Sequence, residues 1–573
     1  MNREKLVTPA IYILLIIVFL APRIPKIDSF VTLDEPSWLS QGANFYYALG
    51  QREFQNTVYE YQPAVTTMWI ISMGMFLYFP EYRGFGQGYL DYEKGRLDPF
   101  MRQHGYDPLV LLTYSRVIQV FLLLILFLVL YYLLQRFLPK IVAGFVVTFA
   151  AFDPFFLSQN RLMNHEGMVS FFVLVSLAAF AVYLFKDRKI LFLLISGVSA
   201  AFAQLSKSSA IAMLAALGVM LLVQIYQERQ LGWGKAILTG MKFFAIWFVS
   251  LAITYFVLWP GMWVAPGKML YQVYGNAFSY AFQGARLTVT EELQPATFSL
   301  NTNLADIWEV AKILLYRTTV ITWIGVLLGF ALPFSRNREL IQQNRLFLTV
   351  LLTNAIAFIL LIGIAQGRNS PHYILTSYLS LNLLAGLGWY YFLQTLNDRF
   401  SLFHTYGQYA LLGLVILSQV WGSLSNFPYY FTYRNPVLYS MGWYNEYPHF
   451  PYGEGLEIAA QYLSELPDAE NTTVFSYYSR GCFSYYYPGK AISFRPYYSD
   501  GEHATDLLAN LKASDYLIVY YANQSQLSHY DNYLKVLSTV EPFHVISLNG
   551  YEYVHIYKVD EFPPEIFEAL ADL

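Results

Sequence analysis

Long runs of apolar residues separated by polar or charged loops fill most of the chain as far as residue 424. Eleven of these runs are long enough to cross the roughly 30 Å hydrocarbon core of a bilayer as helices. Another run, at 64–79, is short and amphiphilic, so we expect it at the membrane interface. We predict transmembrane helices near 6–24, 110–134, 141–157, 167–185, 190–204, 209–226, 237–259, 317–334, 346–365, 373–394 and 407–424.

Charge alternates between the loops that join these runs. Every second loop is short and basic, which is typical of loops on the cytoplasmic side of a membrane. We therefore predict a cytoplasmic N-terminus and, because the number of spans is odd, a C-terminus outside the cytoplasm. The basic loop residues are Arg136, Lys140, Lys186, Arg188, Lys189, Arg229, Lys235, Arg336, Arg338, Arg345 and Arg399.

Two segments on the opposite side are long and polar. The first loop covers about 25–108, and residues 425–573 are rich in tyrosine and large enough to form a domain. The pattern predicts a helix at 453–465 and strands near 472–477, 515–521, 542–547 and 551–558. We therefore divide the chain into a transmembrane domain, 1–424, and a C-terminal extracytoplasmic α/β domain, 425–573.

Composition supports a multi-pass membrane protein. Hydrophobic residues make up 56% of the chain and charged residues 13%, whereas soluble domains contain about 25% charged residues. The net charge of −3 gives no reason to expect a nucleic-acid partner. The single cysteine, Cys482, excludes an intramolecular disulfide and a cysteine-rich metal site.

Adjacent carboxylates, Asp34 and Glu35, follow the first apolar run directly. Carboxylates beside a bilayer are costly to desolvate, so they lie where water, a metal or a substrate can reach them. Glu166 begins the fourth span on the same side of the membrane. We select Asp34, Glu35 and Glu166 as candidate site residues.

Several cationic side chains occur at the same ends of the predicted helices. Lys207, Arg317 and Arg368 lie at outer helix ends, where a lipid headgroup phosphate would be, and we predict that they bind such a phosphate. His372 could join them or act in acid–base chemistry. The simpler interpretation is that carboxylates at these positions face water and the cations reach towards ordinary lipid headgroups. For Arg161 we expect a structural ion pair with Asp153.

The chain resembles polytopic glycosyltransferases of the GT-C class, in the group that contains protein O-mannosyltransferases and aminoarabinose transferases. The resemblance covers roughly residues 30–460 and depends on the order and common sidedness of its motifs. They are Asp34-Glu35, Tyr61-Gln-Pro-Ala-Val-Thr-Thr-Met-Trp69, Asp153 with Asn160-Arg161-Leu162 and Glu166, Lys207, Trp259-Pro-Gly-Met-Trp263, Arg317-Thr-Thr and Tyr452-Gly-Glu-Gly-Leu456.

The resemblance implies a GT-C fold and transfer of a hexose or pentose from a polyprenyl-phosphate donor to an acceptor hydroxyl outside the cytoplasm. The acceptor would be a protein, a lipid or a cell-envelope glycan. Asp34 would act as the base, Glu35 would orient the loop or the acceptor, and Glu166 would bind acceptor or sugar hydroxyls. The reaction would invert the anomeric carbon without an obligatory metal. His165, Glu166 and His372 could form a divalent metal site.

Three positions depart from the pattern of this class. Glu166 follows Asn164-His165 where an aspartate is frequent, Gln62 stands where a basic residue is frequent, and His372 replaces an arginine before Tyr373. A transporter or flippase for a lipid-linked or small polar substrate is the alternative function, and a surface receptor is a third. The polar residues gather at one face rather than in the middle of the spans, which favours the enzyme.

Overall fold

The computed structural model describes residues 3–58, 62–85, 97–283, 300–331, 338–365, 370–399, 405–443, 452–494, 502–521 and 528–571. Most of these residues are helical, and the chain divides into two compact units. The first unit contains Met1–Pro25, Gln41–Asp91 and Tyr114–Asn435. The second contains Lys26–Ser40, Tyr92–Thr113 and Pro436–Leu573.

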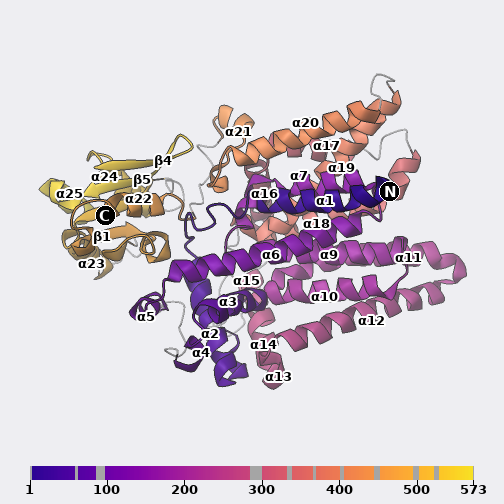
Figure 1. The fold of residues 1–573 in the computed structure, drawn as a ribbon, viewed down its shortest axis with the longest axis horizontal. Coiled ribbons are helices and arrows are strands. Elements are labelled where there is room, and N and C mark those ends of the chain that lie inside the picture. The colour runs from indigo at the N-terminus through magenta and orange to yellow at the C-terminus, as the bar shows by residue number, and fades with distance from the viewer. Residues whose placement is uncertain are drawn as a thin grey trace. The chain divides into compact units, whose positions relative to one another are not determined.

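Each of the eleven predicted apolar runs coincides with a helix of the structure (Figure 1). Residues of these runs are strongly apolar, and a helix satisfies every backbone hydrogen bond within the segment, as lipid requires. The helices are α1 (Arg3–Leu20), α6 (Pro108–Leu134), α7 (Lys140–Ala151), α9 (Glu166–Phe185), α10 (Ile190–Ser206), α11 (Met213–Glu228), α12 (Trp233–Leu258), α17 (Val320–Ala331), α18 (Arg338–Ile364), α19 (Leu375–Arg399) and α20 (Thr405–Leu424).

Length and composition confirm a multi-pass membrane protein but do not determine the number of spans. Within the described residues, six helices are long and apolar enough to cross a membrane, or seven if a bent pair of helices counts as one span. The helices α7 and α10 are shorter, as is the apolar part of α1, Thr8–Leu20. The number eleven therefore stays a prediction.

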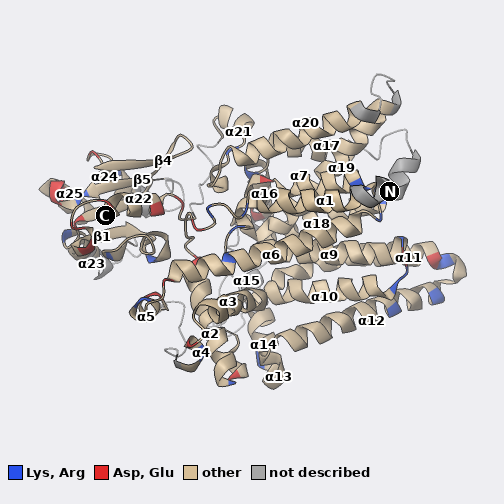
Figure 2. Ribbon diagram, in the orientation of Figure 1, with Lys and Arg blue, Asp and Glu red and all other residues tan. Residues whose placement is uncertain are grey.

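Residues of the first three basic loops lie together at one end of the first unit. The Arg188 guanidinium lies 3.1 Å from the Glu228 carboxylate, and Arg136 lies over the ring of Phe192. The Lys140 ammonium donates to the Thr8 hydroxyl over 3.0 Å. Figure 2 shows lysine and arginine residues at this end of α11 and α12, while the helices are tan over most of their length. We call this region the basic end.

The opposite end of the first unit is held by arginine and tyrosine side chains that bind backbone carbonyls. Arg161 donates to the carbonyl oxygens of Arg23, Pro25 and Pro428, and the Tyr430 hydroxyl donates to the Pro22 carbonyl. Because these residues follow α1, α8 (Pro154–Gln159) and α20, the ends of three distant helices are tied together. Glu166 and Lys207 lie at this end of α9 and α10, so we call it the Glu166 end.

Two apolar runs are broken by polar residues at the Glu166 end. The run predicted at 141–157 is divided because α7 ends at Ala151 and Asp153 caps α8, accepting from the Phe156 N–H over 2.9 Å. The run at 317–334 follows α16 (Leu300–Arg317), and the axes of α16 and α17 differ by 119°. Such bends are tolerated where side chains satisfy the backbone groups that they release.

The remaining elements of the first unit connect or cover these helices. The interfacial helix that we predicted at 64–79 is α3, which is largely buried in the structure. The connecting helices are α2 (Glu35–Gln51), which starts in the second unit, α3 (Val65–Tyr78), α4 (Tyr82–Phe85), α13 (Gly261–Val264), α14 (Pro266–Leu270), α15 (Asn276–Gln283) and the 3₁₀ turns Ser208–Ala212 and Pro371–Ile374.

The second unit is built on a five-stranded sheet with the order β2-β1-β3-β5-β4. Strand β1 pairs in parallel with β2 and β3, while β5 pairs antiparallel with β3 and β4. The α/β prediction is confirmed, and one predicted helix and four strands are found. The elements are β1 (Thr473–Tyr477), β2 (Lys490–Phe494), β3 (Tyr516–Tyr520), β4 (His544–Leu548), β5 (Tyr551–Lys558), α21 (Pro436–Ser440), α22 (Leu456–Ser464), α23 (Glu502–Lys512), α24 (Ser528–Leu537) and α25 (Pro564–Ala571).

Two short segments from the N-terminal fifth of the chain also belong to the second unit. The Tyr486 hydroxyl donates to the Asp28 carbonyl over 2.7 Å, and the Tyr485 hydroxyl donates to the Asp98 carboxylate over 2.7 Å. Asp98 lies in α5 (Leu97–Gln103). Burial raises the pKa of the Asp98 carboxyl, and the nearby Arg480 opposes that shift. The sheet domain is thus assembled from three parts of the chain.

Candidate active site

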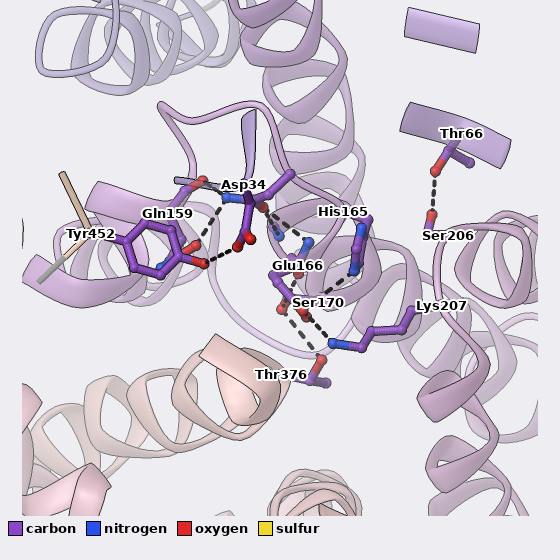
Figure 3. A network of polar contacts seen from close by, with 12 residues as sticks. Asp34, Thr66, Gln159, His165, Glu166, Ser170, Ser206, Lys207, Thr376 and Tyr452 are labelled. Carbon is purple, nitrogen blue, oxygen red and sulfur yellow. Dashed lines mark hydrogen bonds and ion pairs between the residues drawn. The ribbon is translucent and has the colours of Figure 1, made fainter. Parts of the chain in front are cut away.

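A buried ion pair joins Glu166 and Lys207 at the Glu166 end of the first unit. Glu166 is the first residue of α9, Lys207 follows the last residue of α10, and α9 packs against α10. Both side chains are about 95% buried. Figure 3 shows the two charged groups pointing towards each other, with His165 beside them. Glu166 and Lys207 were predicted at one membrane face, and the structure brings them into contact.

The turn before α9 is shaped by amide side chains. The Asn164 side-chain oxygen accepts from the Glu166 N–H over 3.0 Å, and its amide nitrogen donates to Gln159 Oε1 over 2.9 Å. Gly167 has no room for a side chain, because an added Cβ would lie 2.4 Å from Asn160 Oδ1. These contacts determine where α9 begins and therefore where the Glu166 carboxylate lies.

His165 lies next to the carboxylate, with Nε2 3.5 Å from Glu166 Oε1. Burial lowers the pKa of His165, and its interaction with Glu166 offsets part of that shift. The neutral imidazole is therefore favoured near pH 7. The positive charge that faces Glu166 belongs to Lys207.

Aromatic and hydroxyl groups surround Lys207. Its ammonium lies 4.1 Å from the centroid of the Tyr373 ring, a distance typical of a cation–π contact. The Thr66 hydroxyl, in the first turn of α3, lies 2.7 Å from the hydroxyl of Ser206. Across α9, the hydroxyls of Ser170 and Thr376 are 3.3 Å apart. Four elements thus contribute polar groups around this ion pair: α3, α9, the end of α10 and the segment that starts α19.

The other predicted phosphate ligands have different surroundings. Arg317 ends α16, donates to the Phe431 carbonyl over 2.8 Å and lies over the Phe155 ring at 5.8 Å. His372 lies beside Tyr373, with ring centroids 4.4 Å apart. Arg368 lies outside the residues that the structure describes. Arg317 thus stabilises the protein backbone, which our sequence interpretation did not include.

The expected ion pair of Arg161 with Asp153 is wrong. The Arg161 guanidinium binds three backbone carbonyls, at 2.7 to 3.3 Å, and Asp153 caps α8. The reason is local: α8 begins one residue after Asp153, so the carboxylate is used by the first helical N–H groups.

Asp34 and Glu35 belong to the second unit. Glu35 is fully buried, and its Oε2 accepts from the Thr32 N–H over 2.8 Å. This contact stabilises the turn that starts α2. Asp34 is half-buried, and its Oδ2 accepts from the Tyr452 hydroxyl over 3.0 Å (Figure 3). Adjacent carboxylates therefore have separate partners.

Sequence reasoning did not assign a role to Tyr452 or Tyr373. Tyr452 begins the Tyr-Gly-Glu-Gly motif, and Tyr373 follows the singled-out His372. Both could have been found as aromatic residues next to selected motifs, but their partners are far away along the chain. Among the described residues, no group of three or more His, Cys, Asp or Glu could hold a metal ion. Independence from metal stays a prediction.

These observations define a multi-pass helical membrane protein with a buried acid–base pair at one end of its helices and a separate α/β unit that carries Asp34. Residues 112–262 match the family model for dolichyl-phosphate-mannose-protein mannosyltransferase. The match contains both Glu166 and Lys207, and it confirms the resemblance to glycosyltransferases of the GT-C class over this part of the chain. A comparison with curated proteins by sequence gives no match.

Two solved structures are similar to this chain. One is ArnT from Cupriavidus metallidurans bound to undecaprenyl phosphate, with 13% identity, a TM-score of 0.43 and coverage of 95% of this chain and 97% of that chain. Another is the archaeal oligosaccharyltransferase AglB from Archaeoglobus fulgidus in complex with an inhibitory peptide and a dolichol-phosphate. It has 12% identity, a TM-score of 0.46 and coverage of 99% and 77%.

Proposed function

We propose that the protein is a glycosyltransferase that moves a sugar from a polyprenyl phosphate to an acceptor hydroxyl on the extracytoplasmic side of the cytoplasmic membrane. The observation that carries the proposal is the buried pair of Glu166 and Lys207, which lies within the segment matched by the mannosyltransferase family model. Ionised groups are rarely buried in a membrane protein without a function. The proposed sugar class is a hexose or pentose.

Asp34 acts as the base in this reaction. The acceptor hydroxyl attacks the anomeric carbon, the bond from that carbon to the phosphate oxygen breaks, and the hydroxyl proton passes to the Asp34 carboxylate. Polyprenyl phosphate leaves with the bonding electron pair. A single displacement of this kind inverts the anomeric carbon. Glu35, fully buried and bound to the Thr32 N–H, holds the turn that carries the base.

Lys207 stabilises the charge that develops on the departing phosphate. Its ammonium has three donor hydrogens, so it can keep its contact with Glu166 and also donate to a phosphate oxygen. The Tyr373 ring orients the Lys207 ammonium. Before the donor binds, the Glu166 carboxylate balances the buried positive charge of Lys207. Arg317, Arg368 and His372 are the further proposed phosphate ligands.

The substitution Asp34→Asn tests the base. It preserves size but removes the proton acceptor, so transfer should fall by ~10²–10⁴-fold while donor binding survives. The donor is first identified by mass spectrometry of the lipid-linked sugar that copurifies with the protein, and it is then supplied in reconstituted vesicles. Full transfer activity in Asp34→Asn would remove Asp34 as the base and make Glu166 the leading candidate.

A further inference from the structure

Tyr452 connects the C-terminal sheet domain to the turn that carries Asp34. Its hydroxyl donates to Asp34 Oδ2 over 3.0 Å, and its backbone carbonyl accepts from the Leu33 N–H over 3.3 Å. The two residues are 418 positions apart in the sequence and belong to the same compact unit. One tyrosine therefore contacts both the carboxylate and the backbone next to it.

The position of Tyr452 is itself held by the sheet. The Tyr452 N–H donates to Glu454 Oε2 over 2.8 Å, and the Tyr520 hydroxyl, at the end of β3, donates to the Glu454 carbonyl over 2.6 Å. Gly453 has φ +115°, and a Cβ there would lie 2.4 Å from the Val31 carbonyl oxygen. The close approach of the two backbones thus requires glycine.

We propose that Tyr452 is a positioning residue for Asp34, and that the C-terminal domain thereby takes part in catalysis. The proposal depends on the proposed function of Asp34 as the base. The hydrogen bond engages one carboxylate oxygen and limits rotation of the Asp34 side chain. A carboxylate that accepts a hydrogen bond from a residue anchored on a sheet keeps its productive geometry better than a carboxylate on an unsupported loop.

The hydrogen bond also favours the charged form of the carboxylate, because the hydroxyl donates to an anion. Tyr452→Phe removes only that hydroxyl. The acidic limb of the pH–rate profile should then move to higher pH by about one unit, since a hydrogen bond to a charged group is comparable in strength to that shift. The maximal rate should fall about tenfold, with the KM for the donor unchanged.

Tyr486→Phe is the matched control. Tyr486 belongs to the same domain and donates to the Asp28 carbonyl over 2.7 Å, so its hydroxyl tethers the same N-terminal segment at a backbone carbonyl. The wild-type protein, both phenylalanine variants and Asp34→Asn are compared as full-length chains. Activity is measured with dolichyl phosphate mannose and with the copurifying lipid-linked sugar.

A second measurement avoids the need for a substrate. Infrared difference spectra across a pH titration contain the carboxylic acid band of Asp34, identified as the band missing in Asp34→Asn. Its midpoint should move to higher pH in Tyr452→Phe and stay at the wild-type pH in Tyr486→Phe. Both readouts should agree.

Three results would overturn the inference. An unchanged pH profile in Tyr452→Phe, with Asp34→Asn inactive, rejects the role of Tyr452 and leaves the proposed function standing. Equal losses of rate in both phenylalanine variants, without a shift of the acidic limb, reduce Tyr452 to a tether. Full activity of Asp34→Asn rejects Asp34 as the base and with it the positioning role of Tyr452, whereas transfer of the sugar by the other proteins still supports the glycosyltransferase.

Discussion

The buried ion pair between Glu166 and Lys207 says more about the function of this site than either residue does alone. Removing both charges from water costs several kcal/mol for each ion, and their attraction repays that cost only if the geometry is good. Breaking such a pair by removing one partner typically costs about 3–5 kcal/mol, because the other charge stays buried. The pair therefore constrains both stability and function.

A double-mutant cycle separates these two roles. Lys207→Met should lower the thermal unfolding temperature in detergent, and Glu166→Gln should lower it as well, since each leaves an uncompensated buried charge. The double variant should recover most of the stability, because neither charge remains. Transfer activity should stay low in Lys207→Met and in the double variant, since neither retains the ammonium that stabilises the departing phosphate.

The cycle has a clear contrary result. If the double variant recovers activity together with stability, the ion pair only supports the fold and Lys207 does not act on the phosphate. Thermal unfolding is followed by tryptophan fluorescence in the same detergent for all four proteins.

At the residue scale, the sequence predicts the side of the membrane on which each charged side chain lies, but it does not predict which residue that side chain contacts. Glu166 and Lys207 occur at the ends of consecutive apolar runs, so a common face follows from alternation. Arg161 shows the limit of the approach. Whether a guanidinium binds a carboxylate or three carbonyls depends on helix ends that are distant in sequence.

At the scale of elements, the start of α9 controls the position of Glu166. The substitution Gly167→Ala would place a Cβ 2.4 Å from Asn160 Oδ1, and Asn160 is fully buried. Either Asn160 or the first turn of α9 must shift. We expect a loss of about 1–3 kcal/mol of stability and reduced transfer activity, measured by thermal unfolding and by turnover.

Gly218→Ala in α11 provides the matched control. Among the described residues, no atom outside the adjoining helix backbone lies within 4 Å of the position that a Cβ on Gly218 would take. Alanine favours helix over glycine by about 1 kcal/mol, so this variant should be as stable as the wild type or slightly more stable. Equal effects of the two substitutions would show that the packing at the start of α9 does not constrain Glu166.

Hydrophobic runs predicted the positions of the membrane helices well, because burial in lipid leaves a long and continuous pattern. The interruptions were not visible in that pattern. The run at 141–157 holds two helices, because α7 ends at Ala151 and Asp153 caps the start of α8. The bend between α16 and α17 lies at the start of the run at 317–334. Strand β2 was missed because its five residues, from Lys490 to Phe494, show a partly exposed, irregular burial pattern.

At the scale of the whole molecule, the two ends of the first unit support a test of topology. The first three basic loops contact one another at one end, and the helix ends near Arg161 are tied together at the other. Reporter fusions after Lys189 and after Asn426 should therefore report opposite sides of the membrane, with Lys189 in the cytoplasm. Reporters on the same side would reject the prediction of orientation.

The composition of the second unit could not be derived from the sequence. Residues 425–573 have the pattern of a domain, but the unit also contains Lys26–Ser40 and Tyr92–Thr113. Gly481 illustrates the reason: a Cβ on it would lie 2.2 Å from Pro36 Cγ. Contacts between such distant residues leave no local periodicity in the chain.

The contact between Asp34 and Tyr452 also orders events during protein synthesis. A ribosome adds about 5–20 residues per second, so the 418 positions between them take roughly 20–80 s to translate. Throughout that interval the first apolar segments are already available for insertion, while the turn at Asp34 lacks the tyrosine that holds it. The carboxylate acquires its native surroundings only when the last part of the chain has been made, so an incompletely translated protein would occupy the membrane without an assembled site.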